Sequence, residues 1–388
     1  PYDFAHPGGV VNHISCLEQH LTRMGHEVKI ISPASRAVYT LGDRFIRIGT
    51  PRPIPVSGSI ARVTISVQLE SQIKEVFERE KFDICHLHEP LMPTLCTTAL
   101  RLKGAPMVGT FHAAGARPWY IMFSPLAKWY LDRWFNKLDG KICVSHPALD
   151  YISRYFPGEY TIIPNGVDTH DFNNGVTPIE RFSDGKINIL FVGRLEKRKG
   201  FGYLLEAYRL IKREIPDCRL IQVGPGVILR KKYTQRISRR RIPDVNLTGY
   251  ATYADLPRYY KTADIVCFPA TGRESQGLVL LEAMSTGKPV IASSIDGYKS
   301  VLTDGVEGIT VPPRNVAKLA EAMLKLIKDE KLRTQMGERA KPRAMQYDWN
   351  SIAGKVLDFY IETLDRVKKR GAVTVPELPR IGAATGQR

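Results

Sequence analysis

Apolar and polar residues alternate along the chain in two different periods. Short continuous apolar runs, such as Met107–Phe111 and Ile187–Val192, are typical of buried strands. Between them, apolar residues recur at the spacing of amphipathic helices, as they do from Val11 to Met24. Because strand-like and helix-like segments follow one another in turn, the pattern predicts an α/β fold with parallel sheets.

The expected elements form two series. We expect strands at 27–32, 46–48, 63–67, 84–88, 107–111, 141–144 and 161–163, and then at 187–192, 220–223, 245–248, 265–268, 290–293 and 308–311. Helices are expected at 11–24, 68–79, 91–102, 124–138, 146–156, 201–214, 230–241, 256–261, 316–329, 330–343 and 351–369. A short helix is expected to begin near Gly277, and the proline-rich residues 51–55 are expected to form a loop.

Two boundaries divide the expected elements into two domains and a C-terminal segment. Residues 169–185 are polar and contain glycine and asparagine, so we expect them to link a first Rossmann-like domain, 1–168, to a second, 186–346. A last helix follows at 347–370, and the tail 371–388 has the low periodicity of a disordered segment. A glycine pair such as Gly8-Gly9 normally follows a strand in such folds, so we expect further residues ahead of Pro1.

The net charge indicates the class of partner, and the cysteine content indicates the redox compartment. The chain of 388 residues carries 56 Lys and Arg against 39 Asp and Glu, a formal charge of +17. That balance suggests an anionic partner: a membrane surface, a nucleic acid or a phosphorylated ligand. The 6 Cys form no Cys-x-x-Cys pair, which argues for a reducing compartment and against a disulfide framework or zinc site. We see no signal peptide and no apolar run long enough for a spanning helix.

Two carboxylates, Glu274 and Glu282, are the first candidates for function. Between them, Gly277 allows a ligand to approach the backbone closely, and the unpaired N–H groups at the start of the following helix attract an anion. The pair therefore suits a phosphorylated molecule with many hydroxyls, such as a sugar nucleotide. The alternative is a solvated helix face whose glutamates interact favourably with the helix dipole.

Three other segments have the chemistry of ligand contacts. In the basic loop 193–200, Arg194 and Lys199 offer a clamp for a diphosphate, and a solvated charge run is the alternative. Gly8-Gly9 at the start of a helix suits the approach of a phosphate or sugar. His112 ends a strand at the edge where ligands gather, and the alternative is a capping or packing residue.

The sequence allows more than one role for each of two cationic helices. Residues 124–138 mix aromatic and basic side chains, as a core helix with a solvated face does, and as a membrane-interface surface does. Residues 230–241 hold Arg230, Lys231, Lys232, Arg236, Arg239, Arg240 and Arg241. This run fits a solvated helix face, an attachment to anionic membranes or, as a remote alternative, nucleic-acid binding without a recognised motif.

Taken in order, these motifs are similar to those of a known family. The chain resembles the retaining glycosyltransferases of family 4, which have two Rossmann-like domains facing a cleft, the GT-B fold. The resemblance covers nearly the whole chain and is carried by Gly8-Gly9-Val10, His86–Pro90, Pro164–Asp168, Gly193-Arg194 with Lys199-Gly200, and Glu274–Val290. Within the family, the branch that adds the first mannose to phosphatidylinositol is most similar, through Pro1-Tyr2, Pro7–Val10, Ser57–Arg62, Thr110–His112 and Tyr347–Trp349.

The resemblance implies transfer of a hexose, with mannose from GDP-mannose as the leading case, to a membrane lipid such as phosphatidylinositol. The catalytic residues it implies are His112, Arg194, Lys199 and Glu274. The donor-binding residues it implies are Gly9, Gly193, Arg194, Lys199, Glu274, Gln276, Gly277, Leu278 and Glu282, and the acceptor-binding residues are Tyr2, Arg62 and Arg117. It also implies that the C-terminal helix crosses back to the first domain.

Several positions depart from the family pattern. That branch has polar residues where this chain has Ala5, Leu91 and Ala113, and guanine-recognising acidic residues where it has Thr252 and Tyr253. Asp255 is the candidate substitute for the acidic residues. A sister glycosyltransferase that uses a UDP-sugar, or another lipid or soluble sugar acceptor, therefore stays an alternative.

We expect no obligatory metal or other cofactor beyond the nucleotide-sugar donor. The sequence has no Asp-x-Asp motif to hold a metal between phosphates, and the basic clamp supplies positive charge there. No carboxylate pair demands the covalent route of glycosidases. We further expect no nucleic-acid partner, a monomer, and a peripheral position on the inner, cytoplasmic face of the cell membrane, against an anionic lipid surface.

Overall fold

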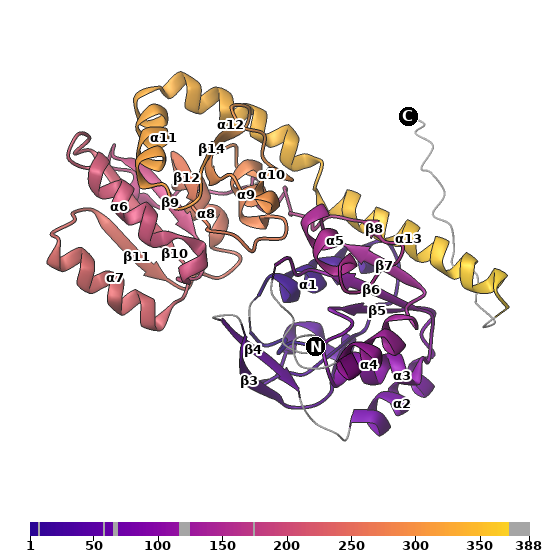
Figure 1. Ribbon diagram of the computed structural model, residues 1–388. Helices are drawn as coiled ribbons and strands as arrows, with labels where there is room; N and C mark the ends of the chain where they lie inside the picture. Colours follow the sequence, from indigo (N-terminus) through magenta and orange to yellow (C-terminus); the bar gives the residue numbers. More distant parts are fainter. Residues whose placement is uncertain (7, 57–58, 65–68, 116–124, 174, 372–388) are drawn as a thin grey trace, which may run out of the picture.

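The chain forms two α/β units, with the first at the N-terminal end and the second after residue 186 (Figure 1). The structure is a computed structural model, and it describes residues 1–6, 8–56, 59–64, 69–115, 125–173 and 175–371. The expected disordered tail, 371–388, lies outside the described residues except for Gly371. Among the helices described, none combines the length and the apolar content that are needed to cross a bilayer.

The N-terminal unit contains a parallel sheet of four strands in the order β5–β6–β7–β8. These are β5 (Cys85–His88), β6 (Met107–Phe111), β7 (Gly140–Cys143) and β8 (Thr161–Ile162). The same unit holds a parallel pair, β1 (Ile30–Ser32) and β2 (Phe45–Arg47), and a hairpin, β3 (Pro51–Val56) and β4 (Ser59–Thr64). Its helices are α1 (Gly9–Arg23), α2 (Leu69–Glu80), α3 (Leu95–Leu102), α4 (Pro125–Phe135) and α5 (His146–Ser153).

Helices cover both faces of the four-stranded sheet, which is why β6 is buried along its whole length. Successive side chains of a strand point to opposite faces. Met107 and Phe111 therefore join the core cluster that contains Trp134 of α4, whereas Val108 joins the cluster that contains Leu17 of α1. The apolar run Met107–Phe111 is thus a central strand whose two faces pack into two different hydrophobic cores.

The prediction of a loop at 51–55 is wrong, because these residues form strand β3. It pairs with β4 in antiparallel register from Pro51 opposite Thr64 to Val56 opposite Ser59. Pro51, Pro53 and Pro55 alternate, so their missing N–H groups all fall on one side of the strand, and the residues between them remain able to pair. The predicted helix at 91–102 begins only at Leu95, because Thr94 has a φ of 71°.

The C-terminal unit contains a six-stranded parallel sheet in the order β11–β10–β9–β12–β13–β14. Its strands are β9 (Ile187–Val192), β10 (Cys218–Val223), β11 (Val245–Gly249), β12 (Ile265–Phe268), β13 (Val290–Ser293) and β14 (Gly308–Val311). Its helices are α6 (Phe201–Ile211), α7 (Val227–Arg239), α8 (Leu256–Thr262), α9 (Leu278–Ser285), α10 (Asp296–Lys299), α11 (Val316–Lys328) and α12 (Glu330–Met345). The strand order changes direction between β9 and β12, which is where α/β sheets bind ligands.

The chain passes between the units twice, and the two passages are bonded to each other. The Val167 N–H donates to the Tyr347 carbonyl at 2.8 Å, and the Trp349 N–H donates to the Val167 carbonyl at 3.2 Å. Helix α13 (Trp349–Lys369) then lies along the N-terminal unit and packs against α1 (Figure 1). The domain limits given from the sequence stay a prediction, but the last helix does contact the first unit.

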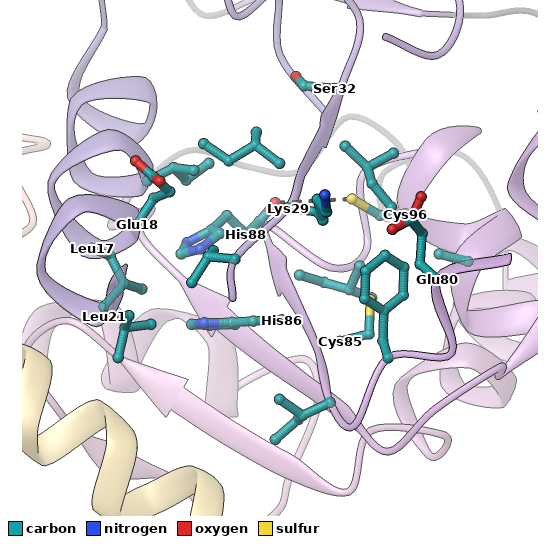
Figure 2. Close-up of a pocket in the computed structure, with 18 of the residues that line it drawn as sticks. Leu17, Glu18, Leu21, Lys29, Ser32, Glu80, Cys85, His86, His88 and Cys96 are labelled. Carbon is teal, nitrogen blue, oxygen red and sulfur yellow. Dashed lines mark hydrogen bonds between the residues drawn. The ribbon is translucent and has the colours of Figure 1, made fainter. Parts of the chain in front are cut away.

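A cavity of about 430 Å³ lies between β1 and β5 in the N-terminal unit. Figure 2 shows Leu17 of α1 and His86 and His88 of β5 around it. Among the described strands, β1 pairs with β2 alone and β5 with β6 alone, and both β1 and β5 line the cavity. The strand expected ahead of Gly8-Gly9 would fit between these two edges, and that expectation stays a prediction.

Replacing Gly200 with alanine should destabilise the protein by more than about 3 kcal/mol. Gly200 begins α6 with a φ of 77°, and an added Cβ would lie 1.8 Å from the Pro269 carbonyl oxygen. Gly185→Ala is the matched control, since Gly185 has a φ of 84° with nothing within 4 Å of its Cβ position. Urea unfolding should show a loss of only about 1 kcal/mol for that control, and equal losses for the two variants would contradict the close approach.

Candidate functional site

The loops that follow β9 and β12 meet at one edge of the C-terminal sheet. These two strands are parallel neighbours, with Ile189 opposite Ile265, so their carboxyl ends lie side by side. The first loop is the basic segment 193–200 and the second contains Glu274. The Thr271 N–H donates to the Arg198 carbonyl at 2.7 Å and ties the two loops together. The strand order therefore brings the basic loop to the first of the two candidate carboxylates.

Acidic and basic side chains alternate along a connected set of ion pairs across these loops. Lys199 Nζ lies 2.8 Å from Glu274 Oε1, and Arg198 Nη1 lies 2.6 Å from the same oxygen. Arg198 also contacts Glu196 at 2.9 Å, and Glu196 contacts the more exposed Arg194 at 3.2 Å. Lys199 and Glu274 are thus brought together as a pair, and Arg194 is connected to them through Glu196 and Arg198.

The backbone around Gly277 forms the start of α9. Gly277 has a φ of 84°, and an added Cβ would lie 2.7 Å from the Tyr298 ring. Leu278 is the first residue of α9, so its N–H and that of Val279 have no partner within the helix, whereas the Leu280 N–H donates to the Gly277 carbonyl at 2.9 Å. Gly193, just after β9, has a φ of 153°, and its Cβ position would lie 3.6 Å from the Phe191 ring. Both glycines are therefore explained by their positive φ, and at Gly277 also by the close packing of Tyr298.

Glu282 lies within α9 and is half-buried. The Tyr260 hydroxyl donates to its Oε2 at 2.7 Å. Burial raises the pKa of the Glu282 carboxyl to about 7, and the hydrogen bond from Tyr260 and the charge of Lys199 offset only part of that rise. Lys199 therefore acts on both candidate glutamates: it bonds Glu274 directly and influences Glu282 through its charge.

Gln276 connects the donor-side loop to the N-terminal unit. Its Oε1 accepts from the Asn165 backbone N–H at 2.7 Å and from Asn165 Nδ2 at 2.8 Å. Its Nε2 donates to the Asn165 carbonyl at 3.1 Å. Both side chains are buried. The side chain of Gln276 is therefore engaged by protein, and only its backbone remains available to contact a ligand.

His112 follows β6 and belongs to a group of neighbouring histidines. His112 Nε2 and His88 Nδ1 share a hydrogen bond of 3.0 Å, and the His13 ring lies 4.8 Å from that of His112. The His112 backbone N–H donates to Glu89 Oε1 at 2.8 Å. Asn165 also acts on His112 and His13, since its side chain raises their pKa values slightly against the effect of burial. Asn165 thus lies between His112 and the loop that carries Glu274.

These histidines are neutral at neutral pH. Burial lowers the pKa of His13 to about 4 and that of His86 to about 3. Burial, with the neighbouring histidines adding to it, lowers the pKa of His88 and His112 well below the usual value. His86 is held by the Tyr360 hydroxyl and by Thr110, each at 2.6 Å. A neutral imidazole accepts or donates one hydrogen bond at each nitrogen, which suits contact with sugar hydroxyls.

Two of the candidate acceptor residues, Tyr2 and Arg62, lie on neighbouring extended segments. Their side chains point to opposite faces, because Tyr2 is paired with Val63 and successive side chains of a strand alternate. Tyr2 forms an antiparallel bridge with Val63, and the Asp3 N–H donates to the Arg62 carbonyl at 2.8 Å. Gly9 is the first residue of α1, is exposed and has nothing within 4 Å of its Cβ position. Arg117, the third candidate acceptor residue, lies outside the described residues.

One group in the described part of the chain has the composition of a metal site. The candidate ligand atoms of His13, His88 and His112 lie within 4.8 Å of one another. Neutral imidazoles are ligands for transition metals, whereas a metal between phosphates prefers oxygen ligands. The ion pairs around Lys199 and Glu274 hold no such group of carboxylates. The expectation of a metal-independent site stays a prediction.

The sequence reasoning did not single out Arg198, Asn165, His13 and His88. Arg198 stands in the same basic loop as Lys199, and its position in a short 3₁₀ turn, Lys197–Lys199, points it at Glu274. His88 and Asn165 stand inside motifs that carried the family resemblance, so that resemblance was the available signal for them. His13 gave no signal, because a single histidine in an amphipathic helix is read as packing.

Two family models match most of the length of the chain. Residues 7–171 match the family model described as Glycosyltransferase Family 4, and residues 177–343 match the model described as Glycosyl transferases group 1. The chain is 34% identical over 370 residues to the phosphatidyl-myo-inositol mannosyltransferase of Propionibacterium freudenreichii subsp. shermanii, covering 93% of each chain. It is 32% identical to the enzyme of the same name from Mycobacterium tuberculosis, covering 93% of this chain and 94% of that one.

Solved structures share the fold at lower identity. A glycosyltransferase from Rickettsia africae superposes with a TM-score of 0.75 at 20% identity, covering 92% of this chain and 95% of that one. Anabaena HepE, solved in complex with UDP, superposes with a TM-score of 0.71 at 19% identity, covering 91% of this chain and 96% of that one. The predicted α/β class with two Rossmann-like units is confirmed.

The raised pKa of Glu282 predicts a specific dependence of stability on pH. Between the unfolded pKa of about 4.5 and the folded pKa of about 7, the unfolded chain ionises while the folded protein keeps the proton. The contribution of Glu282 to stability therefore falls as pH rises through this window, by roughly 3 kcal/mol.

Glu282→Gln should remove this dependence. The difference in unfolding free energy between variant and wild type, measured by urea unfolding, should grow in favour of the variant from about pH 5 to about pH 8. The exposed Glu338→Gln is the control, for which the difference should stay constant. A constant difference for Glu282→Gln as well would contradict the raised pKa.

Proposed function

Because the chain belongs to the glycosyltransferases of family 4, and is thus a hexosyltransferase of the GT-B fold, we propose that it moves mannose from GDP-mannose to phosphatidylinositol with retention of anomeric configuration. The ion-paired contact of Lys199 with Glu274 carries this proposal, because it puts a cation for a diphosphate beside a carboxylate for sugar hydroxyls. The names of the curated relatives support the lipid acceptor.

In this proposal, the two loops of the C-terminal unit hold the donor. Lys199 and Arg194 bind the diphosphate, and Gly193 and Gly9 leave room for it from either side of the cleft. The sugar lies against Glu274 and the backbone of Gln276, Gly277 and Leu278. Glu282 accepts from the ribose hydroxyls with the oxygen that Tyr260 leaves free. The support is that all these positions except Gly9 follow β9 or β12, at the edge where the strand order reverses.

The chemistry that fits these groups needs no protein nucleophile. The bond between the anomeric carbon and the phosphate oxygen breaks, and negative charge builds on the diphosphate, where Lys199, Arg194 and the N–H groups at the start of α9 stabilise it. The acceptor hydroxyl attacks from the same face and gives its proton to the departing phosphate oxygen. The neutral imidazole of His112 would contact the sugar close to the reacting carbon without adding charge to it.

The acceptor side is proposed to lie in the N-terminal unit. Tyr2 would meet the inositol ring, Arg117 would meet the lipid phosphate, and Arg62 would contact another part of the acceptor; the backbones of Tyr2 and Arg62 are neighbours through the bridge at Val63. Closure of the two units around the donor would exclude water, which otherwise competes as acceptor. We place the protein, as a monomer, at the inner face of the cell membrane, where such a lipid is accessible.

A second candidate is a sister enzyme that uses a UDP-sugar or another acceptor. The observation that favours it is the loop before α8, where Thr252 and Tyr253 replace acidic residues of the similar branch. Asp255, the remaining carboxylate, accepts from the Thr252 hydroxyl at 2.7 Å and is therefore partly engaged. Tyr253 packs edge-on against Phe172, with ring centroids 5.9 Å apart. Nucleic-acid binding, the remote alternative, has no such support.

The reaction is tested by a panel of GDP- and UDP-sugars offered with phosphatidylinositol vesicles. GDP-mannose should raise the melting temperature and yield mannosylated lipid, because the bound donor stabilises the folded state. Glu274→Gln should lose transfer by at least about a hundredfold while GDP still raises the melting temperature. Turnover of a UDP-sugar instead would establish the second candidate, and full activity of Glu274→Gln would remove that residue from the mechanism.

The diphosphate contact is tested at Lys199. Lys199→Gln should weaken GDP binding by about 10- to 100-fold, because a hydrogen bond to a charged phosphate contributes about 1.5–3 kcal/mol. Lys197→Gln is the matched control, since Lys197 is an exposed lysine of the same 3₁₀ turn. Isothermal titration should show little change for the control. Equal effects of the two substitutions would mean that general charge, and not a contact at Lys199, attracts the nucleotide.

A further inference from the structure

Helix α4 carries two aromatic residues and two cations on one outward face. Trp129 is 64% exposed and Tyr130 is 49% exposed. Arg133 is exposed one turn further on, and Lys137 follows just after the helix end. Positions 129, 133 and 137 recur at four-residue spacing, so they share one side of the helix, with 130 beside them. Leu131, on the other side, is buried in the core, which determines the orientation of this face.

A buried tryptophan orders this face from beneath. The ring of Trp134 is 5% exposed, and Lys137 Nζ lies 4.9 Å and the Arg133 guanidinium 5.5 Å from its centroid. The Tyr130 ring meets it edge-on at 5.6 Å. These contacts hold both cations and the tyrosine at the surface of the unit at little additional entropic cost.

The charge of this region is positive and only partly neutralised. Burial, and then the charges of Arg133, Lys103 and Arg101, lower the pKa of Lys137, so four cations gather here. Arg101 is paired with Glu70, and Lys103 lies 3.1 Å from Asp139. No carboxylate among the described residues is paired with Arg133 or Lys137.

We propose that Trp129, Tyr130, Arg133 and Lys137, the α4 patch, are the surface through which the protein contacts an anionic membrane. Tryptophan and tyrosine favour the level of lipid headgroups, because each has an apolar ring with a polar group, and the cations attract anionic lipids. The proposal deepens the proposed lipid-acceptor function and rests on it for its purpose, whereas the binding itself is measured without any substrate.

The cationic helix α7 lacks these features. Glu206 of α6 contacts Arg236 of α7 and pairs at 2.7 Å with Arg240, just after the helix, so one carboxylate offsets part of the charge at this end of α7. Its aromatic residue, Tyr233, packs against Phe201 at 5.0 Å. Figure 1 shows α7 in the C-terminal unit and α4 in the N-terminal one. Helix α7 is thus a charge-matched control.

Single-stranded nucleic acids are a second class of partner that surfaces with aromatic and basic side chains bind. Proteins that bind them place the aromatic residues in a groove that follows the backbone of the nucleic acid. The four residues of the α4 patch come from one helix face and the turn after it, and the outward face of a helix is convex. The observations therefore favour a flat lipid surface.

The test uses the full chain and sedimentation with two kinds of vesicle. Wild type should bind vesicles of phosphatidylcholine with phosphatidylglycerol, should bind pure phosphatidylcholine far less, and should lose binding as salt is added. Trp129→Ala with Tyr130→Ala should lower the partition coefficient by roughly tenfold at unchanged net charge.

Two charge-matched variants locate the contact. Arg133→Gln with Lys137→Gln should lower partitioning by roughly tenfold or more, because each basic residue near the surface contributes about fivefold. Lys231→Gln with Lys232→Gln on α7 removes the same charge and should change it by less than about threefold. Melting temperatures establish that each variant is folded. Wild-type binding by both α4 variants, or a larger loss for the α7 variant, would overturn the proposal.

Activity separates this proposal from the proposed function. The α4 variants should lose transfer to an acceptor lipid embedded in anionic vesicles, yet keep wild-type transfer to the same lipid dispersed in neutral detergent. If neither form of the lipid is an acceptor for wild type, the proposed function fails while vesicle binding still decides the α4 patch. Binding of single-stranded DNA that the α4 variants lose, without any vesicle binding, would overturn the membrane proposal.

Discussion

The hydrogen bonds between Asn165 and Gln276 join the two sides of the candidate site. The buried Gln276 amide accepts from the Asn165 backbone N–H and from Asn165 Nδ2, and donates to the Asn165 backbone carbonyl, at distances of 2.7 to 3.1 Å. A buried amide without its partners is costly, so these groups stabilise the contact only as a complete set. Asn165 lies beside His112, and Gln276 lies between Glu274 and Gly277. The position of the histidines relative to the donor loop therefore depends on this one contact, together with the bonded passages at Val167 and Tyr347.

Electrostatics on the two sides of the site are arranged differently. In the C-terminal unit, charges are paired and partly accessible: Glu274 lies between Arg198 and Lys199, so the proposed diphosphate would compete with Glu274 for these cations. On the other side, His13, His88 and His112 are kept neutral by burial and by one another. A neutral surface beside a charged clamp directs the anionic part of a ligand to one side and its hydroxyls to the other.

The large positive charge of the chain is spread over surfaces of different character. At the end of α7, Glu206 pairs with Arg236 and Arg240, and in the basic loop Glu196 and Glu274 pair with Arg198. On α4, cations accompany the exposed aromatic rings of Trp129 and Tyr130. The value of +17 alone does not separate a nucleotide clamp, a solvated helix and a membrane face. The distribution of carboxylates and aromatic rings around each group of cations distinguishes these three surfaces.

Local periodicity and turn residues were enough to predict the order of strands and helices and the parallel sheets. They also predicted the motif residues at the ends of β9 and β12. The sequence did not predict strand β3, since a proline-rich segment reads as a loop until a partner strand is known. Nor did it predict the contacts of Asn165 with Gln276, which are 111 residues apart, or of His86 with Tyr360, which are 274 apart. Such contacts are decided by how the two sheets and the returning helix pack, and no local pattern records that packing.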